Sequence, residues 1–239
     1  MRDVVHAPRF LDLDDLVNAR DLGGWATEQG GRTRFGRVFR SELPRGDAPD
    51  ARATLAKAGV RTVLDLRTDP ERQAAPGPFA TDARFEVVSV DVIGPVDAAR
   101  HEGRLPAHDG DLARIYLDIL ELARDRLLDA LAVVRDAAPR GATLIHCTAG
   151  KDRTGLVAAL LLRGAGVHPD RIADEYALTH DRLAPLRPAL MEGAEAMGVP
   201  ARTYARLLDA RPEFLRPFLE RIDGPLIDAA RGILPTERA

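Results

Sequence analysis

The chain has 239 residues, of which 45% are hydrophobic and 30% charged, and its formal net charge is −3. A chain of this length buries a core large enough to fold without disulfides or a structural metal. Its nearly neutral charge argues against nucleic acid or an anionic membrane as the main partner, because both attract a basic excess. The single cysteine, Cys147, excludes an intramolecular disulfide and a multi-cysteine zinc site.

The sequence contains neither a membrane-spanning segment nor a standard export signal. It has no run of about 18 apolar residues, the length that a membrane-spanning helix requires. Residues 1–15 mix charged and apolar positions and lack the apolar stretch of a signal peptide. We therefore expect no integral membrane association, and a protein that is cytoplasmic or is secreted without a standard signal peptide.

Short apolar segments alternate with helical patterns along the first two thirds of the chain. After an irregular start with turns at Gly23-Gly24 and Gly30-Gly31, β-branched and leucine-rich runs predict strands over 38–41, 60–66, 85–92 and 142–147. Apolar spacing predicts helices over 51–58, over 112–138 as one long helix or two abutting ones, and over 154–163. The stretch 94–111, rich in Gly, Pro, Asp and His, indicates a long loop. The alternation predicts a three-layer α/β fold, with a mostly parallel central sheet flanked by helices.

The remainder of the chain consists of short helical patterns separated by prolines. We expect a single domain over 1–239, with a core over about 14–180. A helical region over about 181–224 is expected to pack on this core or to form a lid. The tail over 225–239 contains Pro225 and Pro235, and we expect it to fray.

One segment, LIHCTAGKDRTG at 144–155, concentrates residues that suit phosphate chemistry. It lies between a predicted strand and an apolar helix, and ligands of open α/β sheets bind at the carboxyl ends of the strands. The N-terminus of the helix would present backbone N–H groups and a positive dipole end to an anion. The dipole, the loop amides and Arg153 all favour the thiolate of Cys147, which is a strong nucleophile. Arg153 can offer a two-point fork to phosphate oxygens, and the Thr154 hydroxyl can hydrogen-bond the sulfur.

Three other interpretations of this segment are weaker. A lone cysteine at a strand end is most often a small core residue, but that does not account for the joint His-Cys-x5-Arg-Thr pattern. A nucleotide-binding P-loop requires glycine where Ile145 stands and Ser or Thr where Asp152 stands. The Gly-x-Ser-x-Gly nucleophile elbow of α/β hydrolases is absent.

The pattern from His146 to Thr154 resembles the signature of the Cys-dependent protein tyrosine phosphatase superfamily. The complete loop HCTAGKDRTG is similar to that of a narrower group, the bacterial atypical tyrosine phosphatases similar to mycobacterial protein tyrosine phosphatase B. Two further segments resemble this group: NARDLGG at 18–24, its entry motif, and VFRS at 38–41, its following strand. The resemblance covers about residues 14–180 and is weak beyond them.

The resemblance implies a two-step reaction without a metal or an organic cofactor. Cys147 attacks phosphorus to form a cysteinyl phosphate, which water then hydrolyses. The implied phosphate-binding residues are Thr148, Ala149, Gly150, Lys151, Asp152 and Arg153. Arg153 also acts on the transferred group, and His146 and Thr154 support the loop.

The sequence leaves the general acid open, because the geometry of proton transfer decides it. Asp152 is favoured, since the family motif keeps an aspartate there. Asp91, at the end of a predicted strand, is the alternative, and Asp109 and Asp111 in the predicted loop follow. Lys151 is one of only two lysines among 34 basic residues, and we expect it to add a point charge for a second phosphate unless it simply faces solvent.

The neighbouring polar residues are assigned supporting roles. We expect Asn18, Arg20 and Asp21 to brace the fold rather than to touch substrate. The strand ends at Arg40-Ser41 and at 65–67 are expected to order the loop or to line its pocket.

Together these residues predict a phosphomonoesterase, foremost a protein tyrosine phosphatase, with dual-specificity or phosphoinositide activity in addition. The expected partner is a phosphorylated protein or a phosphoinositide. A phosphatase of a small-molecule phosphate is the first alternative. A non-catalytic phosphate-binding module is the second, and the intact pair of Cys147 and Arg153 argues against it.

Overall fold

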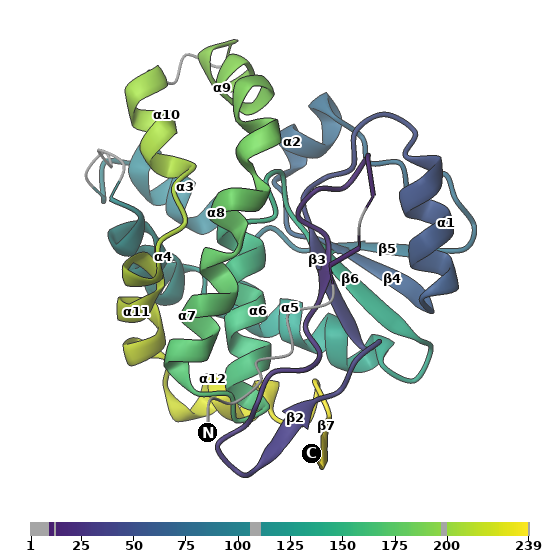
Figure 1. Cartoon of the computed structure of the whole chain (residues 1–239). Coiled ribbons are helices and arrows are strands. Elements are labelled where there is room, and N and C mark those ends of the chain that lie inside the picture. Colours follow the sequence, from purple (N-terminus) through teal and green to yellow (C-terminus); the bar gives the residue numbers. More distant parts are fainter. Residues whose placement is uncertain (1–9, 12, 106–110, 197–199, 239) are drawn as a thin grey trace.

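The computed structural model describes residues 10–11, 13–105, 111–196 and 200–238. Its centre is a five-stranded sheet in the order β1-β3-β6-β4-β5 (Figure 1). The strands are β1 (Arg20–Asp21), β3 (Val38–Ser41), β4 (Val60–Asp65), β5 (Glu86–Ser89) and β6 (Ala142–His146). The last four pair in parallel, and β1 forms an antiparallel edge on β3. The predicted mostly parallel sheet is confirmed.

The central strands are apolar on both faces, which gives the fold its layers. Val63 on β4 and Leu144 on β6 pack on the face covered by α1 (Pro49–Lys57). The next residues along these strands, Leu64 and Ile145, pack on the opposite face. Because successive strand residues point to opposite sides, a continuous apolar run is buried between two layers of helices.

A larger set of helices covers the second face. It comprises α4 (Leu112–Leu122), α5 (Arg124–Ala137), α6 (Asp152–Gly164), α7 (Pro169–Ala177), α11 (Pro212–Arg221) and α12 (Gly224–Ala230). Residues 154–162 of α6 are all buried, as a helix that is apolar on nearly all sides requires. The predicted helix over 112–138 is two helices that meet at Ala123. Among the described residues, no helix combines the length and apolarity needed to cross a membrane.

The prediction of a loop over 94–111 is wrong for its first part, which forms α3 (Gly94–His101). Pro95 lies in the first turn, where its missing N–H costs no hydrogen bond. Val96 and Ala99 are fully buried and hold the helix on the core. Residues 106–110 lie outside the described part of the chain.

Beyond α7 the chain continues as short helices on one end of the molecule. They are α8 (Thr179–Arg182), the 3₁₀ helix η1 (Ala184–Leu186), α9 (Arg187–Ala196) and α10 (Ala201–Leu207). Figure 1 shows α9 and α10 rising beyond the end of the sheet. At their base, Leu183 and Leu186 are buried against Ala149 of the 144–155 segment.

The expectation that the tail over 225–239 frays is wrong as far as residue 238. Pro225 lies in the first turn of α12, whose Ala230 packs so closely on α6 that a Cβ on Gly164 would lie 2.6 Å from its backbone. Leu234 is buried, and β7 (Thr236–Arg238) pairs with β2 (Gly31–Thr33) in a second, two-stranded sheet. Apolar burial on α6 therefore outweighs the polar composition of this segment.

Candidate active site

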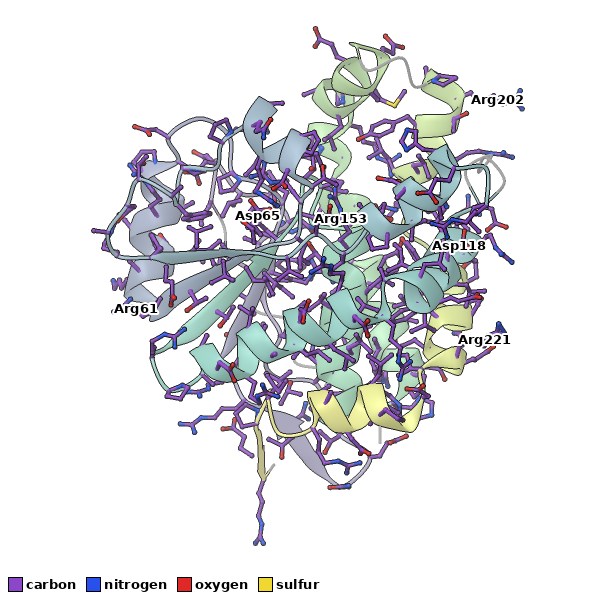
Figure 2. The ribbon with its side chains drawn as sticks, turned by 180° about the vertical axis from the view of Figure 1, so that it is seen from behind. Arg61, Asp65, Asp118, Arg153, Arg202 and Arg221 are labelled. Carbon is purple, nitrogen blue, oxygen red and sulfur yellow. The ribbon has the colours of Figure 1, made fainter. Side chains whose placement is uncertain are left out.

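The loop from Cys147 to Lys151 leaves the end of β6, which lies between β3 and β4, and α6 begins directly after it. It therefore occupies the carboxyl end of the central parallel strand, as predicted. Figure 2 shows Arg153 near Asp65, the last residue of β4, whereas Arg61 near the start of that strand lies at the outer edge. The Cys147 side chain is only 2% exposed.

The loop passes so close to β3 that one position accepts only glycine. Gly150 has a φ of 63°, and a Cβ there would lie 2.3 Å from the carbonyl oxygen of Ser41. Both the backbone conformation and the lack of space exclude other residues. The glycine thus allows the loop to curl tightly against the strand beside it.

Donors from the N-terminal segments hold the loop carbonyls on its outer side. Arg40 Nη2 donates to the carbonyl of Gly150 at 2.6 Å, and Asn18 Nδ2 donates to the same oxygen at 3.3 Å. The N–H of Leu43 donates to the carbonyl of Thr148 at 3.1 Å. In a trans peptide the N–H points away from the carbonyl, so the next N–H groups, of Ala149 and Lys151, face the inner side of the loop. An anion bound there would meet a row of donors.

A buried ion triad fixes the residues that brace the loop. Glu175 of α7 accepts from Arg20 Nε and Arg40 Nη1, both at 2.6 Å, and all three side chains are at most 2% exposed. Burial and the charge of Arg40 lower the pKa of Arg20 to about 10, although Glu175 opposes them. Asp21 accepts from the N–H groups of Gly23 and Gly36 at 2.8 and 2.7 Å. The expected bracing role of the 18–24 segment is confirmed.

Arg153 lies in the first turn of α6, and its two terminal nitrogens form an ion pair with the carboxylate of Glu71. Its Nη1 and Nη2 donate to Glu71 Oε2 and Oε1 at 2.5 and 2.8 Å. Thr148 Oγ1 donates to the same Oε1 at 2.6 Å. A guanidinium held by both terminal nitrogens keeps its Nε edge for a second planar partner, such as two phosphate oxygens.

Glu71 was not among the residues that the sequence singled out. It lies in α2 (Asp69–Ala74), where it forms a capping box with Thr68. Burial alone would raise its pKa, but the hydrogen bonds and charge of Arg153 outweigh this and bring the pKa to about 2. The Thr-x-x-Glu spacing at 68–71 was the available signal, yet it indicates only a helix start.

Lys151 turns away from the loop interior. Its ammonium is fully buried, 2.7 Å from Asp152 Oδ1, and donates to the carbonyl of Asp209 at 2.9 Å and to the Tyr176 hydroxyl at 3.5 Å. An ammonium has three N–H donors, and these contacts use all three. The structure therefore contradicts the expectation that Lys151 offers a point charge to a second phosphate.

Asp152 lies at the boundary between this buried cluster and the loop. Its side chain is 33% exposed, and its Oδ1 accepts from Lys151 and from the Tyr116 hydroxyl of α4. Of the candidate acids it is the one that directly follows the loop, as the first residue of α6. Both donors contact the same carboxylate oxygen.

The alternative acids have other roles or lie elsewhere. Asp91 caps α3 by accepting from the N–H groups of Ile93 and Gly94 at 3.0 and 2.8 Å. Asp111 caps α4 through the N–H of Arg114 at 3.2 Å. Asp109 lies outside the described residues. Asp97 in α3, which the sequence did not suggest, is close enough to interact with the charge of Arg153; burial raises its pKa, while Arg100 and Arg153 oppose the rise.

His146 directly precedes the loop and Thr154 lies in the first turn of α6 after it, and both side chains are buried. The His146 ring is buried, and Nδ1 lies 3.2 Å from the carbonyl oxygen of Cys147. Burial lowers its pKa, so the ring is neutral at pH 7 and supports the loop. The Thr154 hydroxyl is buried without a hydrogen-bond partner among the described residues, so the predicted bond to the cysteine sulfur is not formed in this structure.

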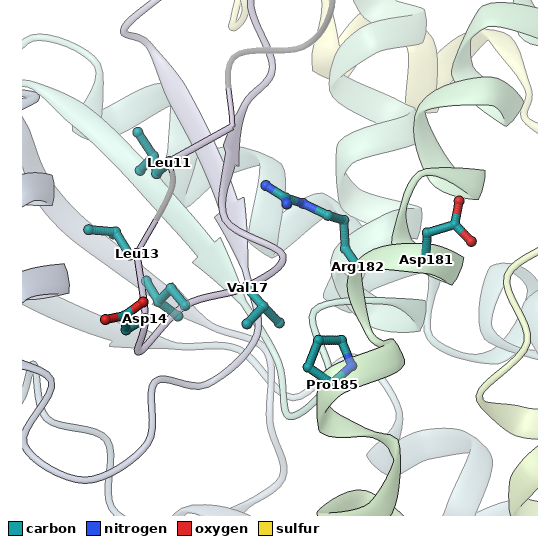
Figure 3. A pocket seen from close by; sticks show the side chains of 8 residues that line it. Leu11, Leu13, Asp14, Val17, Asp181, Arg182 and Pro185 are labelled. Carbon is teal, nitrogen blue, oxygen red and sulfur yellow. The ribbon is translucent and has the colours of Figure 1, made fainter.

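A cavity of about 330 Å³ lies between the N-terminal segment that includes Leu11 and residues 13–17 and the helices α8 and η1 (Figure 3). Arg182 and Pro185 form one wall, and Leu11 and Val17 form the other. None of the predicted site residues lines it. The cavity is therefore separate from the catalytic loop.

The C-terminal helices approach the loop from above. Tyr204 of α10 is part-buried, and its pKa is raised by burial and by the negative charges of Asp152 and Cys147. This interaction places α10 within electrostatic reach of the loop.

A cysteine at the carboxyl end of a central parallel strand, with an arginine in the first turn of the helix that follows, is the arrangement expected of a cysteine-dependent phosphatase. Comparison with known proteins narrows this class: residues 11–226 match the tyrosine phosphatase family, and the chain belongs to that family. It is a protein tyrosine phosphatase.

Individual relatives share most of the chain. A protein of Cupriavidus necator, named as a candidate tyrosine-protein phosphatase, is 33% identical over 220 residues, covering 89% of this chain and 78% of its own length. The Mycobacterium tuberculosis protein named triple specificity protein phosphatase PtpB is 32% identical over 255 residues, covering 89% and 88%. Among solved structures, TpbA of P. aeruginosa aligns with a TM-score of 0.39 at 20% identity, over 82% of this chain and 97% of that one.

Proposed function

We propose that this phosphatase hydrolyses phosphotyrosine, and also phosphoserine and phosphothreonine, in proteins through a cysteinyl-phosphate intermediate. The observation that carries the proposal is that Cys147, at the carboxyl end of β6, is close enough for its charge to act on Arg153, whose two terminal nitrogens are held by Glu71. The family supports the chemistry. The name of the mycobacterial relative supports a breadth beyond phosphotyrosine.

In the first step the Cys147 thiolate attacks phosphorus, so that an S–P bond forms while the P–O bond to the leaving group breaks. Arg153 and the loop N–H groups hold the non-bridging oxygens, on which charge builds in the transition state. Asp152 gives its proton to the leaving oxygen. In the second step water attacks phosphorus, its proton passes to Asp152, and the S–P bond breaks to release phosphate and the thiolate.

Arg153 depends on Glu71 for its orientation in this scheme. The Glu71 carboxylate holds the two terminal nitrogens of the guanidinium and so keeps the Arg153 side chain in one rotamer. The Nε edge is therefore already oriented when phosphate binds. Because Glu71 is ionised throughout the neutral range, the contact persists during turnover.

The helices α9 and α10 are proposed to cover the site. Tyr204 lies within electrostatic reach of Cys147 and Asp152, and Leu183 and Leu186 anchor the base of the pair on Ala149. The whole chain then acts as one phosphatase domain whose C-terminal helices limit access to the loop.

The proposal is tested by initial rates on a phosphotyrosine peptide, the matched phosphoserine and phosphothreonine peptides, a phosphoinositide and a nucleoside monophosphate at equal concentration. We expect turnover of the three peptides, with phosphotyrosine fastest. Since Lys151 is occupied, we expect no preference for a second phosphate on the substrate. Turnover of the nucleotide alone would replace the protein substrate by a small molecule, and no turnover of any ester would refute catalysis.

A further inference from the structure

A ring of four polar groups lies beneath the catalytic loop, and we infer from it that Tyr116 is a positioning residue that orients Asp152 for proton transfer. The inference rests on the proposed function, because it assumes that Asp152 is the general acid. Tyr116 comes from α4 and is far from the loop in sequence. It contacts Asp152 rather than Cys147 or Arg153.

The hydrogen bonds of the four groups can all run in donor-to-acceptor directions that are compatible with one another. Lys151 Nζ donates to the Tyr176 hydroxyl at 3.5 Å, and the two tyrosine hydroxyls lie 2.6 Å apart. If Tyr176 donates to Tyr116, the proton of Tyr116 is free to bond Asp152 Oδ1, which it contacts directly. Lys151 lies 2.7 Å from the same Oδ1 and completes the ring. Every hydroxyl in this order donates once and accepts once.

Burial makes the ring rigid and fixes its protonation states. The side chains of Tyr116, Tyr176 and Lys151 are at most 1% exposed. Burial and the charge of Asp152 raise the pKa of Tyr116 far above its usual value, so its hydroxyl stays a donor. Burial alone would lower the pKa of Lys151, but the charge of Asp152 and the hydrogen bonds to Asp152 and Tyr176 raise it, so the ammonium stays charged. Water has no access to replace these contacts.

The two donors leave Asp152 with one oxygen for chemistry. Both contacts fall on Oδ1, and within the described residues Oδ2 has no hydrogen-bond partner. Asp152 is also the one ring member that reaches the surface, at 33% exposure. When Asp152 carries the acid proton, Oδ2 is the oxygen left to hold it; the proton passes to the leaving oxygen as the P–O bond breaks, while the electron pair of the O–H bond stays on the carboxylate. Tyr116 and Lys151 then stabilise the negative charge that this transfer creates.

The test compares two buried tyrosines, of which Tyr116 contacts Asp152 and Tyr176 does not. Tyr116→Phe removes a donor to Asp152, whereas Tyr176→Phe removes an equally buried hydroxyl that does not touch the carboxylate. Rates are measured on phenyl phosphate, whose leaving group needs a proton, and on p-nitrophenyl phosphate, whose leaving group does not. We expect Tyr116→Phe to lose about tenfold or more on phenyl phosphate and much less on p-nitrophenyl phosphate, as a lost hydrogen bond to a charged group implies. We expect Tyr176→Phe to leave the ratio of the two rates unchanged.

Equal losses on both esters for Tyr116→Phe would overturn the inference and make the residue merely structural. So would a ratio change of the same size in Tyr176→Phe. If Tyr116→Phe does not fold, as its melting curve would show, Lys151→Met removes the other donor to Oδ1 and must produce the same selective loss on phenyl phosphate. Absence of that selectivity would overturn the inference as well.

Asp152→Asn separates this inference from the proposed function. A selective loss on phenyl phosphate in Asp152→Asn supports its role as the acid, and adding Tyr116→Phe to that variant should then cause no further selective loss. A further selective loss would show that Tyr116 acts independently of Asp152. Equal losses on both esters in Asp152→Asn would refute the acid assignment itself, whatever Tyr116 does.

Discussion

The carboxylate oxygens of Glu71 lie 2.5 and 2.8 Å from Nη1 and Nη2 of Arg153, so the arginine that is predicted to bind phosphate is held from α2 rather than from its own helix, α6. The same carboxylate caps α2 through the N–H of Thr68 at 2.9 Å and accepts from Thr148 at 2.6 Å. One side chain thus joins the helix after β4 to both ends of the catalytic loop. The stability of α2 and the orientation of Arg153 are therefore linked.

Glu71→Gln should lower kcat and reduce stability above pH 4.5. The pKa of Glu71 falls from 4.5 to about 2 on folding. A carboxyl group whose pKa is lowered on folding stabilises the protein above the unfolded value, and this contribution is lost as pH falls towards the folded value. Denaturant unfolding of both proteins between pH 7 and pH 2 should show a stability difference that shrinks from pH 4.5 downwards. A difference that is constant with pH would contradict this electrostatic role.

Cys147→Ser should abolish turnover while the loop still binds an oxyanion. A serine hydroxyl is not appreciably ionised at neutral pH, so the variant lacks the thiolate nucleophile. Its kcat should fall by several orders of magnitude. Phosphate or vanadate binding, measured by calorimetry, should persist because the N–H groups and Arg153 are unchanged. Retention of a few per cent of the wild-type rate would exclude the covalent intermediate.

Arg153→Lys should lower kcat by roughly 10²–10³-fold, the loss expected for a missing transition-state donor. A lysine supplies the charge but not the planar two-point grip, and it cannot make the end-to-end pair with Glu71. Steady-state kinetics on a phosphotyrosine peptide measure the effect. Near-normal kcat in this variant would mean that Arg153 serves the fold alone.

Glu175→Gln should destabilise the protein by about 3–5 kcal/mol, because it leaves the buried guanidinium groups of Arg20 and Arg40 without a counter-charge. Glu28→Gln is the matched control, since Glu28 pairs with Arg163 at the surface. That substitution should cost at most about 1 kcal/mol. Urea unfolding at pH 7 gives both values, and similar losses for the two variants would contradict the triad's importance.

Gly150→Ala should abolish activity, whereas Gly36→Ala should not. Both glycines have positive φ, 63° and 72°, so both substitutions carry backbone strain of similar origin. Only at Gly150 does the added Cβ meet backbone, 2.3 Å from the Ser41 carbonyl oxygen, whereas at Gly36 no atom lies within 4 Å. Activity and melting temperature are measured for both variants. A loss shared by both variants reflects backbone strain, whereas a loss of activity in Gly150→Ala alone reflects displacement of the loop. An active Gly150→Ala enzyme would show that the loop tolerates movement away from β3.

The sheet and the position of the catalytic loop could be predicted from the sequence because both depend on local patterns. The apolar run around Val63 and Leu144 marks strands buried on both faces, and the strand-loop-helix order at 144–155 places Cys147 at a strand end. The helix α3 was missed because Gly94 and Pro95 are typical of loops, although proline is equally typical of a first helical turn.

The partners of the loop residues could not be predicted, because they are set by tertiary packing. No local pattern shows that Lys151 points towards Tyr176 and Asp209, and a lysine inside a phosphate loop suggests the opposite direction. Glu71 likewise shows only its helix-capping pattern. The C-terminal segment was misjudged because the burial of Leu226 and Leu234 depends on α6, which a composition argument cannot include.

Cys147 is the only thiol in the chain and is 2% exposed. A thiol-directed reagent therefore reports on the catalytic loop alone, without background from other sites. The stoichiometry of labelling counts competent active sites in a preparation, and its rate measures how often the sulfur becomes accessible. The enzyme thus carries its own probe of access to the loop, with no engineered cysteine required.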